Sequence, residues 1–172
     1  MNACYFDTSV FLAILNGESS GPGIRALLRE LKTAKTKIYT SIITVQETSV
    51  EAIRNGGRAD ELLGQISKLA RIQTITREIA LKAALLEGQV IARMKASDLS
   101  EEERVGLNRR RKWDCFHIAT AIDLGCAVLY SQDTKMINRK LHLSLKGMEF
   151  LEPLPSAINL FPPDEDAPGL VN

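Results

Sequence analysis

A chain of 172 residues, 45% hydrophobic and 25% charged, can bury the core of one domain, which excludes a disordered or fibrous protein. No apolar run approaches the roughly 18–20 residues of a membrane span, and the N-terminus has neither the basic nor the long apolar segment of a secretory signal. The net charge is +1. Because the three cysteines form no CxxC pair, we expect a cytoplasmic protein without a structural zinc site.

Short apolar runs alternate with helical patterns along most of the chain. Strands are expected at residues 4–6, 37–40, 72–75 and 127–130, with a last one near 150–151. Helices are expected at residues 8–14, 24–31, 43–53, 59–70, 76–94 and 113–124, with a short one after 133. The segment 95–112 is polar and is expected to precede the helix at 113, although it contains a capping-box-like Ser100-Glu101-Glu102-Glu103. The alternation predicts an α/β fold, a three-layer α/β/α sandwich around a mainly parallel central sheet.

Four carboxylates stand at the ends of these expected elements. Asp7 directly follows the first strand, Glu47 lies early in the helix after the second, Asp114 opens the helix before the fourth strand, and Asp133 follows that strand. A parallel sheet brings such positions to one edge, where ligands bind in open α/β folds. Clustered carboxylates repel one another, and a hard cation such as Mg²⁺ or Mn²⁺ gives a reason to gather them.

Each of the four residues also has a purely structural interpretation. Asp7 and Asp133 are each good N-caps for the helix that follows, and capping alone would explain either one. Asp114 is a favourable charge near a helix N-terminus, and Glu47 alone would be a solvated helix residue. The metal-site hypothesis therefore depends on the four residues occurring together.

Four segments in order resemble the successive motifs of PIN-domain proteins. The segments are Tyr5-Phe6-Asp7-Thr8-Ser9-Val10-Phe11, Thr44-Val45-Gln46-Glu47, Asp114-Cys115-Phe116-His117-Ile118-Ala119-Thr120-Ala121 and Leu129-Tyr130-Ser131-Gln132-Asp133. The resemblance covers roughly residues 2–151, and it implies a three-layer sandwich with a parallel sheet. It also implies a metal-dependent endoribonuclease, often the toxin of a VapBC-type toxin–antitoxin pair.

The resemblance also implies roles for individual residues. Asp7, Glu47, Asp114 and Asp133 match the family's acidic catalytic metal site, which would use Mg²⁺ or Mn²⁺ to hydrolyse RNA. Ser9 and Ser131 match hydroxyl positions that support this site. Implied partners are an RNA substrate, an antitoxin protein and a second copy in a homodimer. The apolar faces of helices 24–31 and 59–70 are the candidate dimer surfaces.

Further residues near the motifs have two interpretations each. The basic run Arg109, Arg110, Arg111 and Lys112 suits RNA phosphates, and it equally suits a solvated surface. His117 follows Asp114 by three residues and could reach a substrate or shuttle a proton. A packed, hydrogen-bonded histidine is the alternative for this position.

Two other functions compete with the nuclease. A non-catalytic PIN-like domain that binds RNA or protein is the alternative, although retention of all four acids argues against it. A phosphoacceptor signalling domain would need an Asp at the end of the middle strand, where Thr76 and Arg77 follow instead. Residues 1–151 are therefore assigned to one PIN-like domain. Residues 152–172 are assigned to an acidic tail that holds five of the six prolines.

Overall fold

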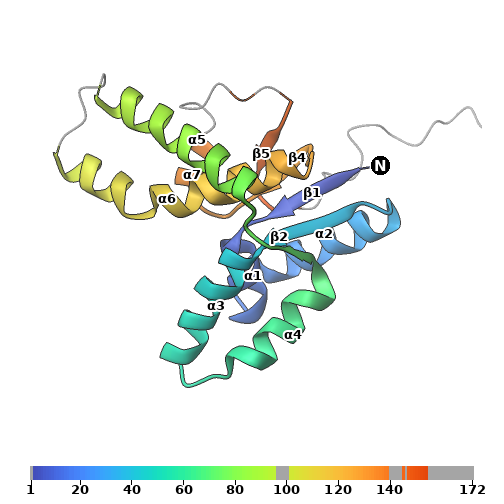
Figure 1. The fold of residues 1–172 in the computed structure, drawn as a ribbon. Coiled ribbons are helices and arrows are strands. Elements are labelled where there is room, and N and C mark those ends of the chain that lie inside the picture. The colour runs from blue at the N-terminus through green and yellow to red at the C-terminus, as the bar shows by residue number, and fades with distance from the viewer. Residues whose placement is uncertain (1, 96–100, 140–144, 146, 155–172) are drawn as a thin grey trace, which may run out of the picture.

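The fold is seen in a computed structural model that describes residues 2–95, 101–139, 145 and 147–154 (Figure 1). The side chains of residues 94, 101–111 and 138–139 lie outside this description. Five parallel strands form one sheet in the order β3-β2-β1-β4-β5. Their bounds are β1 Ala3–Phe6, β2 Lys37–Ser41, β3 Arg71–Gln73, β4 Val128–Tyr130 and β5 Glu149–Leu151. The expected α/β fold with a parallel sheet is confirmed.

Helices connect the strands and cover both faces of the sheet (Figure 1). Their bounds are α1 Thr8–Leu15, α2 Gly21–Thr33, α3 Ile42–Arg54, α4 Ala59–Leu69, α5 Arg77–Lys95, α6 Glu101–Asp123 and α7 Thr134–Arg139. Because side chains alternate along a strand, β1 contributes to two cores. Tyr5 packs with residues of α5 and α6, while Cys4 and Phe6 pack with residues of α1, α2 and α4. This division produces the three layers.

The largest difference from the sequence-based expectation is the start of α6. We expected a polar connection over residues 95–112 and a helix from Trp113, but one helix runs from Glu101 to Asp123. Residues 101–112 are mostly Glu, Arg, Lys and Leu, which favour helix without any apolar periodicity. Figure 1 shows α5 and α6 side by side, extending beyond the sheet.

The apolar faces of α2 and α4, the candidate dimer surfaces, lie partly in the core. Ile24 and Leu27 of α2 and Ile66 of α4 are buried in the core beside β1. Other apolar residues of these helices stay accessible, such as Leu63 of α4 at 41% exposure, so the dimer interface remains a prediction. Among the described residues, no helix is long and apolar enough to cross a membrane.

The expected domain end at residue 151 is close to the end of the described chain. Leu151 ends β5, yet Pro153 two residues later is buried. The packed part of the chain therefore extends to residue 153 at least. Residues 155–172, most of the expected acidic tail, lie outside the described residues.

The sheet order places a change of direction at β1. From β1 the chain adds β2 and β3 on one side, and then β4 and β5 on the other. Open α/β folds bind ligands where the strand order reverses, outside the carboxyl ends of the strands. In this chain that position is the end of β1 and β4, where Asp7 and Asp133 follow.

Candidate functional site

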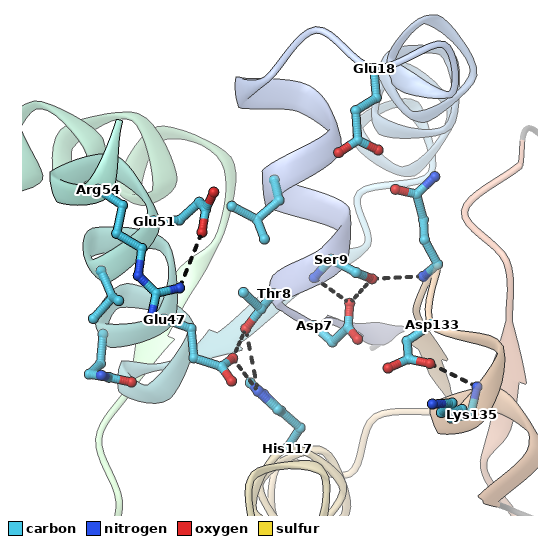
Figure 2. A pocket seen from close by; sticks show the side chains of 14 residues that line it. Asp7, Thr8, Ser9, Glu18, Glu47, Glu51, Arg54, His117, Asp133 and Lys135 are labelled. Carbon is cyan, nitrogen blue, oxygen red and sulfur yellow. Dashed lines mark hydrogen bonds and ion pairs between the residues drawn. The ribbon is translucent and has the colours of Figure 1, made fainter. Parts of the chain in front are cut away.

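A pocket of about 560 Å³ opens at the carboxyl ends of β1 and β4 (Figure 2). Three of the four predicted carboxylates line it, one from the end of β1, one from α3 and one from the loop after β4. Its lining residues are Asp7, Thr8, Ser9, Leu12, Glu18, Gln46, Glu47, Val50, Glu51, Arg54, His117, Gln132, Asp133 and Lys135. The fold therefore brings together side chains that are up to 128 positions apart in sequence.

Asp7 is buried at the N-terminus of α1 and is the N-cap of that helix. Its Oδ1 atom accepts hydrogen bonds from the backbone N–H of Ser9 at 3.0 Å and of Val10 at 3.4 Å. The Ser9 hydroxyl donates to the same oxygen at 2.6 Å. The capping interpretation from the sequence is thus correct for Asp7, and it coexists with a position on the pocket wall.

The loop after β4 binds the other side of the Asp7 carboxylate. Ser131 is fully buried and donates its hydroxyl hydrogen to Asp7 Oδ2 at 2.6 Å. The same hydroxyl accepts the backbone N–H of Asp133 at 2.9 Å, and the Ser9 hydroxyl accepts that of Gln132 at 2.8 Å. Two serine hydroxyls therefore connect Asp7 to the backbone that carries Asp133.

Burial raises the pKa of the Asp7 carboxyl above the usual aspartate value. The nearby His117 imidazole acts in the opposite direction, as do the hydrogen bonds from Ser131, Ser9 and Val10. Desolvation outweighs these contributions, so the ionised carboxylate is destabilised in its site. A cation bound in the pocket would lower this pKa by direct attraction.

Glu47 lies on the opposite side of the pocket, on α3 (Figure 2). The hydroxyl of Thr8 donates a short hydrogen bond to Glu47 Oε2. His117 Nε2 lies 3.3 Å from the same oxygen. Thr8 is the first residue of α1, directly after Asp7, so the Asp7 and Glu47 sides of the pocket share one backbone segment.

His117 is buried on α6, and its ring contacts four other elements. Its Nδ1 atom lies 2.7 Å from the hydroxyl oxygen of Tyr5 on β1 and 3.5 Å from that of Ser41 at the end of β2. Its Nε2 atom faces Glu47 and, at 3.4 Å, Thr8 Oγ1. The packed, hydrogen-bonded interpretation is therefore correct, and the ring also lines the pocket.

Asp114 is the predicted carboxylate that does not line the pocket. It is buried on α6, three residues before His117. Asp114 interacts with other residues, while its buried Oδ2 atom accepts no hydrogen bond from the described part of the chain. Across the described residues, no three Asp, Glu, His or Cys side chains lie close enough to hold a metal ion by themselves.

Basic side chains occur around the pocket as well as acidic ones. Arg54 of α3 and Lys135 of α7 line it, and both are exposed. Of the predicted RNA-binding run, Lys112 is exposed on α6. The side chains of Arg109, Arg110 and Arg111 lie outside the described residues, although their backbone is helical.

Sequence reasoning missed Thr8, Arg54 and Lys135 as pocket residues. Thr8 stands in the first motif segment, but no site role was assigned to it, because the sequence does not show which way its side chain points. Arg54 lies seven residues after Glu47, about two helical turns along α3. That spacing puts both side chains on one face, so periodicity could have found it.

Comparison with known proteins agrees with this geometry. Residues 4–140 match the family model described as PIN domain. A comparison with curated proteins gave no match.

Several solved structures share the fold at low sequence identity. A toxin-antitoxin complex from Klebsiella pneumoniae is similar at 17% identity, with a TM-score of 0.54, over 89% of this chain and 99% of the other. VapBC2 from Rickettsia felis, bound to a DNA fragment from the promoter, has 13% identity and a TM-score of 0.56, over 87% and 98%. Mycobacterium tuberculosis VapC20, a Sarcin-Ricin loop cleaving toxin, has 18% identity and a TM-score of 0.52, over 77% and 92%. With the family model matching most of its length, this chain belongs to the PIN domain family.

Proposed function

We propose that this protein is a metal-dependent endoribonuclease that hydrolyses RNA phosphodiester bonds, of the kind that acts as toxin in a VapBC-type pair. The observation that carries the proposal is the meeting of Asp7, Glu47 and Asp133, from three separate elements, around one pocket at the reversal of strand order. Membership of the PIN domain family supports it. The VapBC and VapC proteins among its structural neighbours suggest the toxin class.

The donor set fits a hard divalent cation such as Mg²⁺ or Mn²⁺. These ions prefer oxygen ligands, and Mg²⁺ usually keeps several waters while only one or two carboxylates bind it. A pocket with spaced carboxylates, in which no three described side chains converge, suits such a hydrated ion better than a fully enclosed one. In this proposal Asp7, Glu47, Asp114 and Asp133 hold the metal, directly or through water.

The residues of the chain contribute orientation and charge. When bound, the metal would supply Lewis-acid chemistry, by activating a water and offsetting charge on a phosphodiester oxygen. Ser9 and Ser131 hold the Asp7 carboxylate in one orientation through their hydroxyls. Burial of Asp7 limits water around the carboxylate, which strengthens its attraction to a cation.

RNA binding would use the basic side chains near the acidic pocket. Arg54 and Lys135 are proposed to pair with phosphates on either side of the cleaved bond, and their positions on α3 and α7 within the pocket lining support this. Arg109, Arg110, Arg111 and Lys112 are proposed to extend this phosphate contact along α6. We also propose an antitoxin protein and a second copy of the chain, in a homodimer, as partners, and a cytoplasmic location.

A cleavage assay tests the proposed function. Purified protein is incubated with single-stranded and structured RNAs, with Mn²⁺, with Mg²⁺, or with a chelator alone. We expect cleavage that requires the metal and that is lost in Asp133→Asn, because this change removes one negative charge from the pocket wall. The control is Asp60→Asn, an exposed carboxylate of α4 that is not among the pocket residues.

A non-catalytic PIN-like domain that binds RNA or protein is the second candidate. The observation in its favour is that, within the described residues, no group of three ligand-type side chains is close enough for a metal. The same assay separates the two functions. RNA that is bound but never cleaved, with any of the metals, would favour the binding domain.

A further inference from the structure

We propose that His117 is a positioning residue for Glu47: its ring, fixed by Tyr5, donates a hydrogen bond that holds the Glu47 carboxylate in place for the metal. This inference rests on the proposed function. It assigns a role to a buried residue that is not one of the four carboxylates proposed to hold the metal. The three residues of this hydrogen-bonded arrangement, Tyr5, His117 and Glu47, come from β1, α6 and α3.

The direction of the hydrogen bond follows from the chemistry of the acceptor. An ionised carboxylate only accepts hydrogen bonds, so the Nε2 atom of His117 must carry the hydrogen that faces Glu47 Oε2 at 3.3 Å. The hydroxyl hydrogen of Thr8 is already given to Glu47. Thr8 Oγ1, 3.4 Å from Nε2, is therefore a second acceptor for the ring and does not compete as a donor.

The other ring nitrogen fixes the ring itself. Burial raises the pKa of Tyr5 far above its ordinary range, so the phenol keeps its hydrogen. In the neutral ring Nδ1 is then an acceptor, and the Tyr5 hydroxyl donates to it across 2.7 Å. If the ring becomes a cation, Nδ1–H donates to the phenol oxygen instead, and Nε2–H still faces Glu47.

The difference in burial between His117 and Glu47 explains why a hydrogen bond from His117 restricts the Glu47 side chain. The side chain of His117 is 3% exposed, whereas that of Glu47 is 31% exposed. A partly exposed carboxylate on a helix samples several rotamers unless a neighbour selects one. A rigid donor below it reduces that freedom, in the way that hydrogen-bonding partners of ligands tune metal sites elsewhere.

Two measurements test the proposal. In the first, long-range ¹H–¹⁵N spectra of the imidazole are recorded on the metal-free protein and on Glu47→Gln. We expect a hydrogen on Nε2 in the wild-type protein and a changed Nε2 signal in Glu47→Gln. A ring that carries its hydrogen on Nδ1 alone would overturn the proposal without any reference to metal or activity.

In the second, Mn²⁺ binding is titrated by electron paramagnetic resonance, and RNA cleavage is measured in parallel. His117→Leu keeps most of the volume but removes the donor, so we expect Mn²⁺ affinity to fall about 10–100-fold. His117→Gln places an amide N–H near the Nε2 position and should recover most of the affinity. Tyr5→Phe, which removes only the hydroxyl, should cause a smaller loss and serves if His117→Leu does not fold.

The matched control is Thr120→Val, a buried position on the same helix whose hydroxyl bonds to the Phe116 carbonyl at 2.7 Å. It should bind Mn²⁺ as the wild-type protein does. Equal affinity in His117→Leu and wild type, or no recovery in His117→Gln, would overturn the positioning role. If the wild-type protein binds no Mn²⁺, the proposed function fails and the role for Glu47 fails with it, while the Nε2 signal would still show the hydrogen bond.

Discussion

Ser131 donates a hydrogen bond of 2.6 Å to Asp7 Oδ2 across 124 positions of sequence. The hydroxyl simultaneously accepts the backbone N–H of Asp133 at 2.9 Å. One buried side chain thus sets the position of the carboxylate after β1 relative to the loop after β4. These are neighbouring strands at the point where the strand order reverses.

Replacement of Ser131 by alanine tests this connection. Ser131→Ala leaves Asp7 Oδ2 and the Asp133 N–H without their bridging hydroxyl in a buried place, which typically costs about 1–3 kcal/mol of unfolding free energy. Urea denaturation without divalent metal measures the loss. The control Ser67→Ala removes an exposed hydroxyl that bonds within α4, and it should change stability little. Equal effects of the two changes would contradict a special role for Ser131.

Replacement of Asp7 by asparagine tests the metal site. Asn keeps the size and capping ability of Asp but removes one negative charge. We expect Mg²⁺ or Mn²⁺ to raise the melting temperature of the wild-type protein, because the ion binds the folded state preferentially. In Asp7→Asn this rise should shrink and RNA cleavage should disappear. Equal metal-dependent shifts, with cleavage unaffected, would remove Asp7 from the site.

Stability without metal should depend on pH through Asp7. Because the folded-state pKa of Asp7 is raised above 3.8, the folded protein binds this proton more tightly than the unfolded chain does. Ionised Asp7 therefore destabilises the fold at neutral pH, and the penalty is relieved as pH falls through the raised pKa. Asp7→Asn lacks this penalty, so it should be more stable than wild type at about pH 7 and the difference should shrink toward about pH 4. Denaturant titrations at both pH values measure the difference, and one that stays constant would contradict the raised pKa.

Removal of the acidic tail should increase RNA affinity. Pro153 is buried, so truncation after Leu154 preserves the packed part of the chain and removes Asp164, Glu165 and Asp166. Loss of three negative charges should strengthen RNA binding several-fold at low salt, and the effect should fade as salt screens it. Fluorescence anisotropy measures the affinity. The full-length chain with these three acids changed to Asn or Gln should match the truncation, and a truncation that fails to fold would show that the tail belongs to the core.

The fold was predictable because its signals are local. Short apolar runs and amphipathic helices alternate in the sequence, and this pattern identifies the class directly. The start of α6 was not predictable from apolar periodicity, because residues 101–112 carry no apolar stripe. The local signals are helix propensity and the capping-box-like Ser100-Glu101-Glu102-Glu103, which directly precedes or begins the helix. The extent of a helix that packs along part of its length is decided by its neighbour, here α5.

The candidate site was predictable in part. Motif order identified Asp7, Glu47 and Asp133, together with Ser9 and Ser131, because their places at element ends follow from topology alone. The pocket position of His117 and Thr8 depends on which way their side chains point, and sequence spacing does not determine that. The burial of Asp114, which is not among the lining residues, likewise depends on the rotation of α6 about its own axis.

β1 is hydrogen-bonded along both of its edges, whereas β3 and β5 form the open sides of the sheet. Local opening starts where neighbours are few, so amide hydrogens of β1 should exchange among the slowest in the molecule. Asp7 directly follows β1, and Asp133 follows β4, which is also paired on both edges, so both carboxylates project from the middle of the sheet. Both acidic positions at this edge of the pocket are therefore expected to keep their places when local opening begins at β3 or β5.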